Sequence, residues 1–149
     1  MMKMLIGQFA AYTGVSVRTL HYYDEIGLLR PALIDGENGY RYYDEGCAER
    51  MRDILYYREL GFTLKGISQL LACEKYDRRI AIREQKKLLM LKKKRLERLM
   101  LALEAAEKGE IIMNKDAFDN SEFTAARDSY AEEARRNLPP IHARRGWRS

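Results

Sequence analysis

Residues 6–29, IGQFAAYTGVSVRTLHYYDEIGLL, contain the pattern that decides the fold, two short helices separated by a glycine. In the first half, small or apolar residues recur at the spacing of one helix face: Ile6, Phe9, Ala10 and Thr13. Gly14 then predicts a helix end, and Ser16 is a natural N-cap for a second helix. This second helix is expected over roughly residues 17–26, which gives the segment the form of a helix-turn-helix.

The second helix separates its side chains onto two faces. At 100° per residue, Leu20 and Tyr23 point to one side. The polar arc on the other side consists of Arg18, His21, Tyr22 and Glu25. A plain solvated face is the alternative, but an aromatic side chain on the polar side argues against it. An arc of this kind has the shape needed to enter a DNA major groove. The candidate DNA-contacting residues of this helix are Arg18, Thr19, His21 and Tyr22.

The next segment has the composition of a β-hairpin wing. Two turn dipeptides, Asp35-Gly36 and Asn38-Gly39, precede an extended stretch. In that stretch Tyr40 and Tyr42 share one face and Arg41 takes the other. An arginine among tyrosines at a hairpin edge suits a phosphate backbone, so Tyr40, Arg41 and Tyr42 are also candidate DNA contacts. The alternative for the tyrosines is packing of the wing onto the helices, which we expect for one or two of them.

Two further helices are predicted after the wing. Asp44 is a candidate cap for the first, which ends before Gly61, and Thr63 is a candidate cap for the second. The predicted core stripe of the first is Cys47, Met51, Ile54 and Leu55, and that of the second is Leu64, Ile67, Leu70 and Leu71. The basic residues on their outer faces either hold flanking phosphates or form a solvated surface: Arg52, Arg58 and Lys65.

Residues 77–109 predict one long helix, because neither glycine nor proline interrupts them before Gly109. At ~1.5 Å per residue it would span about 45–50 Å, too long to be buried by so small a domain. Leucine or isoleucine recurs every seven residues, and Gln85 and Lys92 occupy the matching positions that weaken the first half of this seam. Pairing with a second copy is therefore expected. The candidate dimerisation residues are Ile82, Leu89, Leu96, Leu99 and Leu103.

The net charge of +5 does not locate a DNA site. Residues 1–76 carry nine basic and ten acidic side chains, whereas residues 77–109 carry eleven basic and five acidic ones. The predicted DNA-reading part is thus close to neutral, and the placement of a few arginines and tyrosines has to identify the site.

Other classes of function lack support in the sequence. The two cysteines, Cys47 and Cys73, and the two histidines show no metal-ligand spacing, so neither a metal nor a cofactor is expected. No serine, histidine and carboxylate set, phosphate loop or carboxylate pair suggests an enzyme. No signal peptide or long apolar span is visible, so a cytoplasmic protein without a membrane partner is expected.

The motifs as a set resemble one family, the MerR transcriptional regulators. Residues 6–29 resemble the opening of that family, residues 38–43 (NGYRYY) its first wing, and residues 60–64 (LGFTL) the start of its second helix pair. Residues 17–21 and 57–62 are most similar to the thiopeptide- and multidrug-responsive (TipA-like and Mta-like) branch.

The resemblance implies a mostly α fold in three parts. These are a winged helix-turn-helix DNA-binding domain over residues 1–76, a dimerisation helix forming an antiparallel coiled coil over 77–109, and a short vestigial or truncated effector region over 110–149. A helix is expected there from about Ser121 to Asn137, with Phe123, Ala126 and Tyr130 on one side. It either docks on the long helix or stays partly disordered.

The resemblance also implies a function. A homodimer would bind an inverted repeat in double-stranded promoter DNA and distort it, which affects RNA polymerase indirectly. A small-molecule effector is possible in this family. The alternative is an interaction protein whose coiled coil pairs with a longer regulator of the family and modulates it. Measurement of the molecular mass, alone and with candidate partners, separates the two functions.

Overall fold

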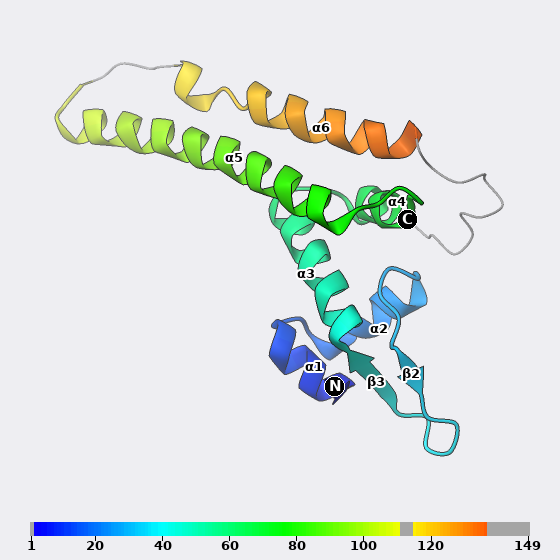
Figure 1. The fold of residues 1–149 in the computed structure, drawn as a ribbon. Coiled ribbons are helices and arrows are strands. Elements are labelled where there is room, and N and C mark those ends of the chain that lie inside the picture. The colour runs from blue at the N-terminus through cyan, green and yellow to red at the C-terminus, as the bar shows by residue number, and fades with distance from the viewer. Residues whose placement is uncertain (1, 111–114, 137–149) are drawn as a thin grey trace.

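The computed structural model describes residues 2–110 and 115–136 of the chain. It is mostly helical, with a small sheet and one long helix (Figure 1). In chain order the elements are β1 Lys3–Leu5, α1 Ile6–Thr13, α2 Val17–Glu25, β2 Leu33–Ile34, β3 Arg41–Asp44, α3 Glu45–Glu59, α4 Leu64–Ala72, α5 Arg78–Glu107, the 3-10 helix η1 Lys115–Phe118 and α6 Ser121–Arg136. The predicted fold class is thereby confirmed, while the pairing of α5 with another chain is left to proposal.

The helix-turn-helix forms where the sequence predicts it. Gly14 ends α1 in the left-handed region at φ 76°, which a residue without Cβ adopts without strain. Ser16 then caps α2, since its Oγ accepts the Thr19 backbone N–H at 3.0 Å. The buried residues of the two helices, Phe9, Leu20 and Tyr23, are those on the predicted apolar faces.

The wing belongs to a three-stranded antiparallel sheet in the order β1-β3-β2. Met4 lies opposite Tyr43 in the register of β1 and β3, and Leu33 lies opposite Tyr42 in that of β2 and β3. The sequence analysis did not predict β1, because three residues are too few to show alternation. The ring of Tyr43 is fully buried and stacks on Phe9, with centroids 4.5 Å apart. One wing tyrosine therefore packs the sheet against α1.

Helix α3 connects the lower part of the molecule, with α1, α2 and the sheet, to the upper part with α4, α5 and α6 (Figure 1). Asp44 caps it as predicted by accepting the Cys47 backbone N–H at 3.0 Å. The prediction that Leu55 belongs to its core stripe is wrong, because that side chain is 38% exposed. The fourth position of the stripe is instead taken by Tyr57, and a fully buried Asp53 lies beside the stripe.

Asp53 joins α3 to the segment that leads into α5. Its Oδ2 accepts the Tyr76 hydroxyl at 3.0 Å and the Arg78 Nε–H at 3.2 Å. Its backbone oxygen accepts Gln85 Nε2 at 3.4 Å, and further along α5 Lys92 Nζ donates to the Glu59 backbone oxygen at 2.9 Å. The two polar positions that weaken the α5 seam thus contact α3 of the same chain.

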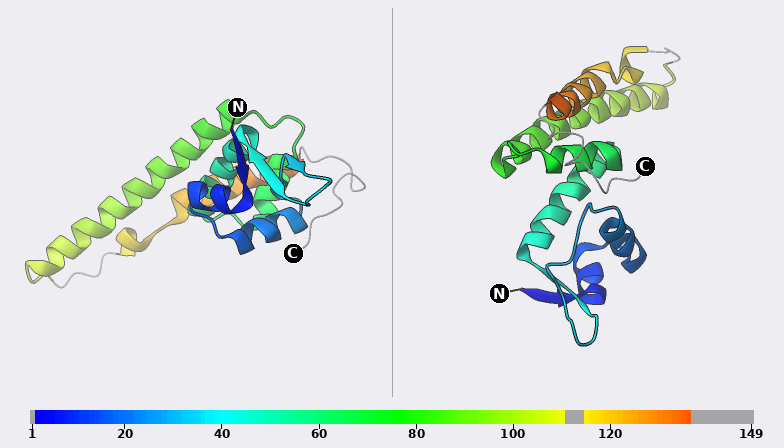
Figure 2. Two further views of the ribbon diagram at one scale, coloured as in Figure 1. Left: turned by 90° about the horizontal axis from the view of Figure 1, so that it is seen from below. Right: turned by 90° about the vertical axis from the view of Figure 1, so that its right-hand side faces the viewer.

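The C-terminal helix α6 runs back along α5 in the opposite direction and reaches α4 (Figures 1 and 2). It covers most of the predicted segment, although Asn137 and the basic residues beyond it lie outside the described part of the chain. Phe123 and Ala134 are buried, and Ala126 and Tyr130 are partly buried against the core. Of the two alternatives for this segment, docking on the long helix is therefore the one observed. No helix within the described residues is long and apolar enough to cross a membrane.

Candidate DNA-binding surface

The predicted reading face of α2 is on the surface. Arg18 and His21 are exposed, and Tyr22 is 41% exposed although its neighbour Tyr23 is buried. Leu20 and Tyr23 anchor the opposite side of the helix in the core. The helix is therefore held by one face while its polar face is available to a partner, as insertion into a groove requires.

Thr19 has a second role at the start of α2. Its Oγ1 lies 2.8 Å from Ser16 Oγ, and its backbone N–H donates to the same Ser16 oxygen. The hydroxyl pair ties the first turn of the helix together. Thr19 thus lies on the reading helix, where the sequence placed it, but it also holds the cap that positions Arg18.

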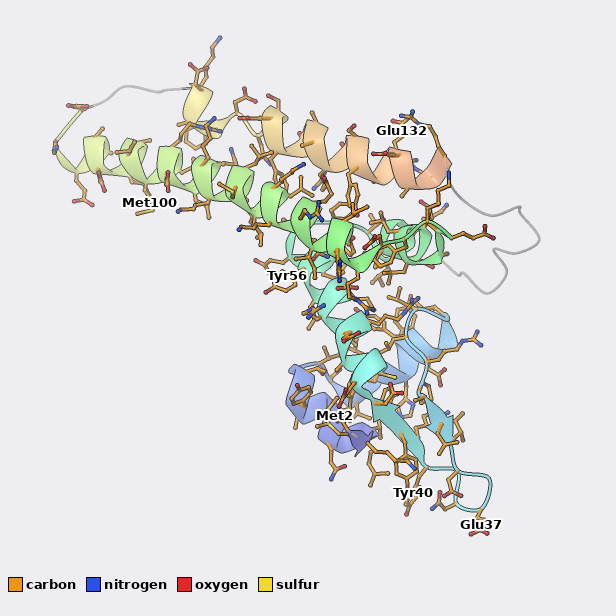
Figure 3. All side chains as sticks on the ribbon, in the orientation of Figure 1. Met2, Glu37, Tyr40, Tyr56, Met100 and Glu132 are labelled. Carbon is orange, nitrogen blue, oxygen red and sulfur yellow. The ribbon has the colours of Figure 1, made fainter. Side chains whose placement is uncertain are left out.

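The wing residues lie beside α2, and they differ in what they contact. Tyr40 is 55% exposed and lies near the end of the hairpin (Figure 3). Arg41 is half-buried, and its Nε lies 3.3 Å from Asp24 Oδ2 on α2. The Tyr42 ring faces Lys3, whose Nζ lies 4.9 Å from the ring centroid. The wing is therefore tied to the reading helix through Arg41.

Two contributors to this surface were not found from the sequence. Asp24 is the partner of Arg41 across a separation of 17 residues, for which no local pattern exists. Lys3 places a cation beside Tyr42 because β1 pairs with β3. A cation on the unpredicted strand adds to the exposed donors near the wing, which are suited to phosphate oxygens.

Two basic residues of α3 have partners within the chain, which leaves them less available to DNA than Arg18. Arg58 Nη1 donates to the Phe62 backbone oxygen at 3.3 Å, and Arg52 lies 3.8 Å from the buried Asp53 carboxylate. Lys65 is exposed at the start of α4. Arg50, which the sequence analysis left out, is also structural. Its Nε donates to the Leu28 oxygen at 2.7 Å, and burial lowers the pKa of its guanidinium.

The candidate dimerisation residues form an apolar stripe on α5. Ile82, Leu96 and Leu103 are exposed, and Leu89 and Leu99 are partly exposed. Met100 adds a sixth apolar side chain near the same stripe and is labelled on the lower side of α5 in Figure 3. A largely exposed apolar stripe of this length is typical of helices that pair with another helix.

Helix α6 lies on the other side of α5 from this stripe. Ile80 and Glu84 line a cavity with Tyr130 of α6, and Arg98 Nη2 donates to the Asp119 oxygen just before α6. Each of these three positions is two residues from a member of the stripe, which is a rotation of about 200°. Docking of α6 and pairing through the stripe are therefore compatible.

The residues that the structure describes contain no candidate metal site. Within 2–110 and 115–136, no group of three or more histidine, cysteine, aspartate or glutamate side chains is placed to hold a metal ion. Cys47 is buried, and burial raises the pKa of its thiol.

Comparison with known proteins places this geometry in a family. The family described as "MerR HTH family regulatory protein" matches residues 4–73, and the one described as "MerR, DNA binding" matches residues 48–109. The HTH-type transcriptional activator Mta of Bacillus subtilis is 34% identical over 142 residues, which are 91% of this chain and 55% of Mta. The activator TipA of Streptomyces coelicolor is 41% identical over 105 residues, which are 70% of this chain and 41% of TipA.

A solved structure is similar over almost its whole length. The crystal structure of the HTH-type transcriptional regulator SkgA from Caulobacter crescentus superposes with a TM-score of 0.67 at 34% identity. The alignment covers 87% of this chain and 97% of that one. By contrast, the chain spans only about half the length of Mta.

Proposed function

The chain belongs to the MerR family of helix-turn-helix regulatory proteins, and from this premise we propose that it binds an inverted repeat in promoter DNA as a homodimer and regulates transcription by distorting that DNA. The proposed base and phosphate contacts come from the exposed face of α2 and from the wing. The residues are Arg18, Thr19, His21, Tyr22, Tyr40, Arg41 and Tyr42.

The observation that carries the DNA-binding proposal is the two-sided character of α2. Leu20 and Tyr23 are buried, while Arg18 and Tyr22 point away from the core. Arginine donates to guanine O6 and N7 or to phosphate, and a tyrosine hydroxyl donates to phosphate oxygens. The Arg41–Asp24 pair supports a fixed position of the wing relative to this helix, so that both would contact the duplex together.

The homodimer proposal is supported by the exposed stripe on α5. Two copies related by a two-fold axis would cover it in an antiparallel coiled coil through Ile82, Leu89, Leu96, Leu99 and Leu103. The axis would place the two α2 helices symmetrically, so the half-sites should form an inverted repeat. The base pairs between the half-sites must bend or untwist for the duplex to meet both helices. They would therefore contribute to specificity although the protein does not contact them.

The test is selection of bound duplexes from a random DNA pool, followed by footprinting on the selected site. The proposal requires protection of one continuous inverted repeat with enhanced cleavage at its centre, where the duplex is distorted. Uniform coating without a preferred sequence would contradict it. Mass determination of the free protein accompanies the footprint, because a chain that stays monomeric alone and pairs only with a longer relative would favour the interaction-protein alternative.

A further inference from the structure

Helix α6 contacts α4 and α5, two helices that also contact α3 (Figure 1). Its residues Arg127 and Ala131 line a cavity with the turn before α4. In the part of the chain that the structure describes, α3 connects the lower part, with the reading helix, to this region (Figure 1). The contacts of α6 therefore lie where the direction of α5 relative to α3 is determined.

Tyr130 is the residue through which α6 reaches α3. Its hydroxyl lies 3.0 Å from the hydroxyl of Tyr57, a fully buried residue of α3. The two rings stack with centroids 6.3 Å apart, and Tyr130 meets Phe62 edge-on at 6.2 Å. Burial raises the pKa of both hydroxyls, so both keep their protons at neutral pH and one donates to the other.

Further contacts hold the middle and the start of α6. Near its middle, Arg127 lies over Gly61 in the turn between α3 and α4, where an added Cβ would come within 2.8 Å of Arg127 Nη1. At its start, Glu122 lies 3.7 Å from Lys94 of α5, and Arg98 Nη2 donates to the Asp119 oxygen at 3.2 Å. The helix thus contacts α3, α4 and α5 at once.

We propose that α6 is a brace that fixes the direction of α5 relative to α3, with Tyr130 as its positioning residue, and that it thereby selects the spacing of the two DNA half-sites. The inference rests on the proposed function, since it assumes a dimer paired through α5. In such a dimer the distance between the two α2 helices follows from the angle at which each α3 meets its α5. A brace across that angle makes one half-site spacing favourable and its neighbours costly.

The brace acts through packing rather than through DNA contact. Tyr130 belongs to α6, which lies in the upper part of the molecule with α4 and α5, while the proposed DNA contacts belong to α2 and the wing in the lower part (Figure 1). Its loss should therefore change which spacing is preferred more than it changes the binding of one half-site. A residue needed only for stability would not have this effect.

The test compares the full chain with three variants: Tyr130→Ala, Tyr130→Phe and the control Glu132→Ala. Glu132 is exposed and lies about 200° around α6 from Tyr130, so its loss leaves the brace intact. Binding is measured to a series of duplexes in which the selected inverted repeat is lengthened or shortened one base pair at a time, and to a single half-site. Hydrogen exchange of α4 and α6 in the free protein reports docking independently of DNA.

The wild-type chain and Glu132→Ala should prefer one spacing by about tenfold over its neighbours, a usual size for coupling between distant sites. In Tyr130→Ala the backbone amide hydrogens of α6 should exchange faster. This variant should lose most of the spacing preference but should still bind a single half-site. Tyr130→Phe removes only the hydroxyl pair and should weaken the preference by about threefold. If Tyr130→Ala fails to fold, the spacing preference of Tyr130→Phe tests the proposal instead.

If a folded Tyr130 variant keeps the wild-type preference for one half-site spacing, the proposal that α6 acts as a brace is wrong. A wild-type chain without preference for any inverted repeat overturns the proposed function instead, and the inference falls with it. The hydrogen-exchange result tells the two failures apart, because docking of α6 is measured without DNA.

Discussion

Arg18 is the side chain whose replacement tests the reading face most directly. It is exposed at the second position of α2, and alanine is a good helix former, so Arg18→Ala should leave the melting temperature unchanged. Affinity for the selected duplex should fall by about 1–3 kcal/mol, the usual worth of a bidentate arginine contact with a base pair. Fluorescence anisotropy with the selected duplex and with a scrambled one measures this loss.

The matched control for Arg18 is Arg79→Ala, which removes an exposed arginine from the start of α5, away from α2. It should reduce binding to both duplexes slightly and equally, because it changes only the overall charge. Equal losses in the two variants would mean that Arg18 contributes bulk charge and not recognition.

Asp44 offers a test of capping through pH. Its carboxylate accepts the Cys47 backbone N–H, and this hydrogen bond holds its pKa below the ordinary 3.8. A depressed folded pKa adds stability that is present above the unfolded pKa and is lost as the pH falls through the folded one. Asp44→Ala should therefore lower the free energy of unfolding by about 1 kcal/mol at neutral pH, and by less below pH 3.8.

Asp44→Asn is the control for the titration, because asparagine also caps helices but carries no charge. The difference in the free energy of unfolding between Asp44→Asn and Asp44→Ala should persist in acid. The difference between the wild type and Asp44→Ala should shrink there. Chemical denaturation at several pH values makes both comparisons. A difference between wild type and Asp44→Ala that does not depend on pH would show that the charge of the cap adds nothing.

At the scale of elements, the sequence predicts helices well where a cap and a periodic face coincide. Ser16, Asp44 and Thr63 all cap helices in the structure as their positions indicated. The sequence does not predict the burial of a residue whose contact partners are distant along the chain. The burial of Asp53 depends on Tyr76 and Arg78, which local periodicity cannot reveal, and Leu55 was placed in the core because a one-dimensional stripe cannot show which edge of it faces solvent.

The same distinction applies to the candidate site. Arg18, His21 and Tyr22 were found because a helix shows its two faces in its own sequence. Asp24 was missed as the partner of Arg41, because their contact depends on how the wing folds back over α2. The docking of α6 was left open for a similar reason, since Tyr57 lies 73 residues before Tyr130.

Asp53 is the test of how α3 holds α5. Asp53→Ala leaves the hydroxyl of Tyr76 and the guanidinium of Arg78 without this acceptor, so the free energy of unfolding should fall by about 2–3 kcal/mol, as for other hydrogen bonds to a charged group. Asp53→Asn keeps an oxygen for Tyr76 and should lose less. Urea denaturation followed by circular dichroism provides the measurement.

Arg52→Ala is the control for Asp53. The Arg52 side chain is 47% exposed and lies 3.8 Å from the same buried carboxylate, without a hydrogen bond to it, so its loss should cost less than that of Asp53. If both variants lost the same stability, Asp53 would act only through its charge and not through the hydrogen bonds that join α3 to the start of α5.

At the scale of the whole molecule, the surface of α5 divides into three parts with different surroundings. In the first half of the seam Gln85 and Lys92 contact α3, the positions near Ile80, Glu84 and Arg98 contact α6 and the segment before it, and the second half of the stripe, with Leu96 and Leu103, is exposed. The first two parts hold one protomer together. The exposed second half of the stripe is available to a second copy, so dimerisation can be tested there without disturbing the protomer.

Leu96→Glu tests this exposed half of the stripe. Leu96 is 51% exposed, so glutamate is tolerated in a single protomer, but in a coiled coil a charge would be buried in the seam at a high cost. The variant should be monomeric by sedimentation equilibrium with an unchanged circular dichroism spectrum. It should bind a single half-site as the wild type does, and lose the advantage of the inverted repeat.

Met90→Glu is the matched control, because Met90 is also an exposed apolar residue of α5, at 63%, but lies about 120° away from Leu96 around the helix. It should remain dimeric and keep its preference for the inverted repeat. If Met90→Glu dissociates the protein and Leu96→Glu does not, the seam lies on the face of Met90. The two α2 helices would then be displayed in a different relative orientation, and the inverted repeat would have to be sought at another spacing.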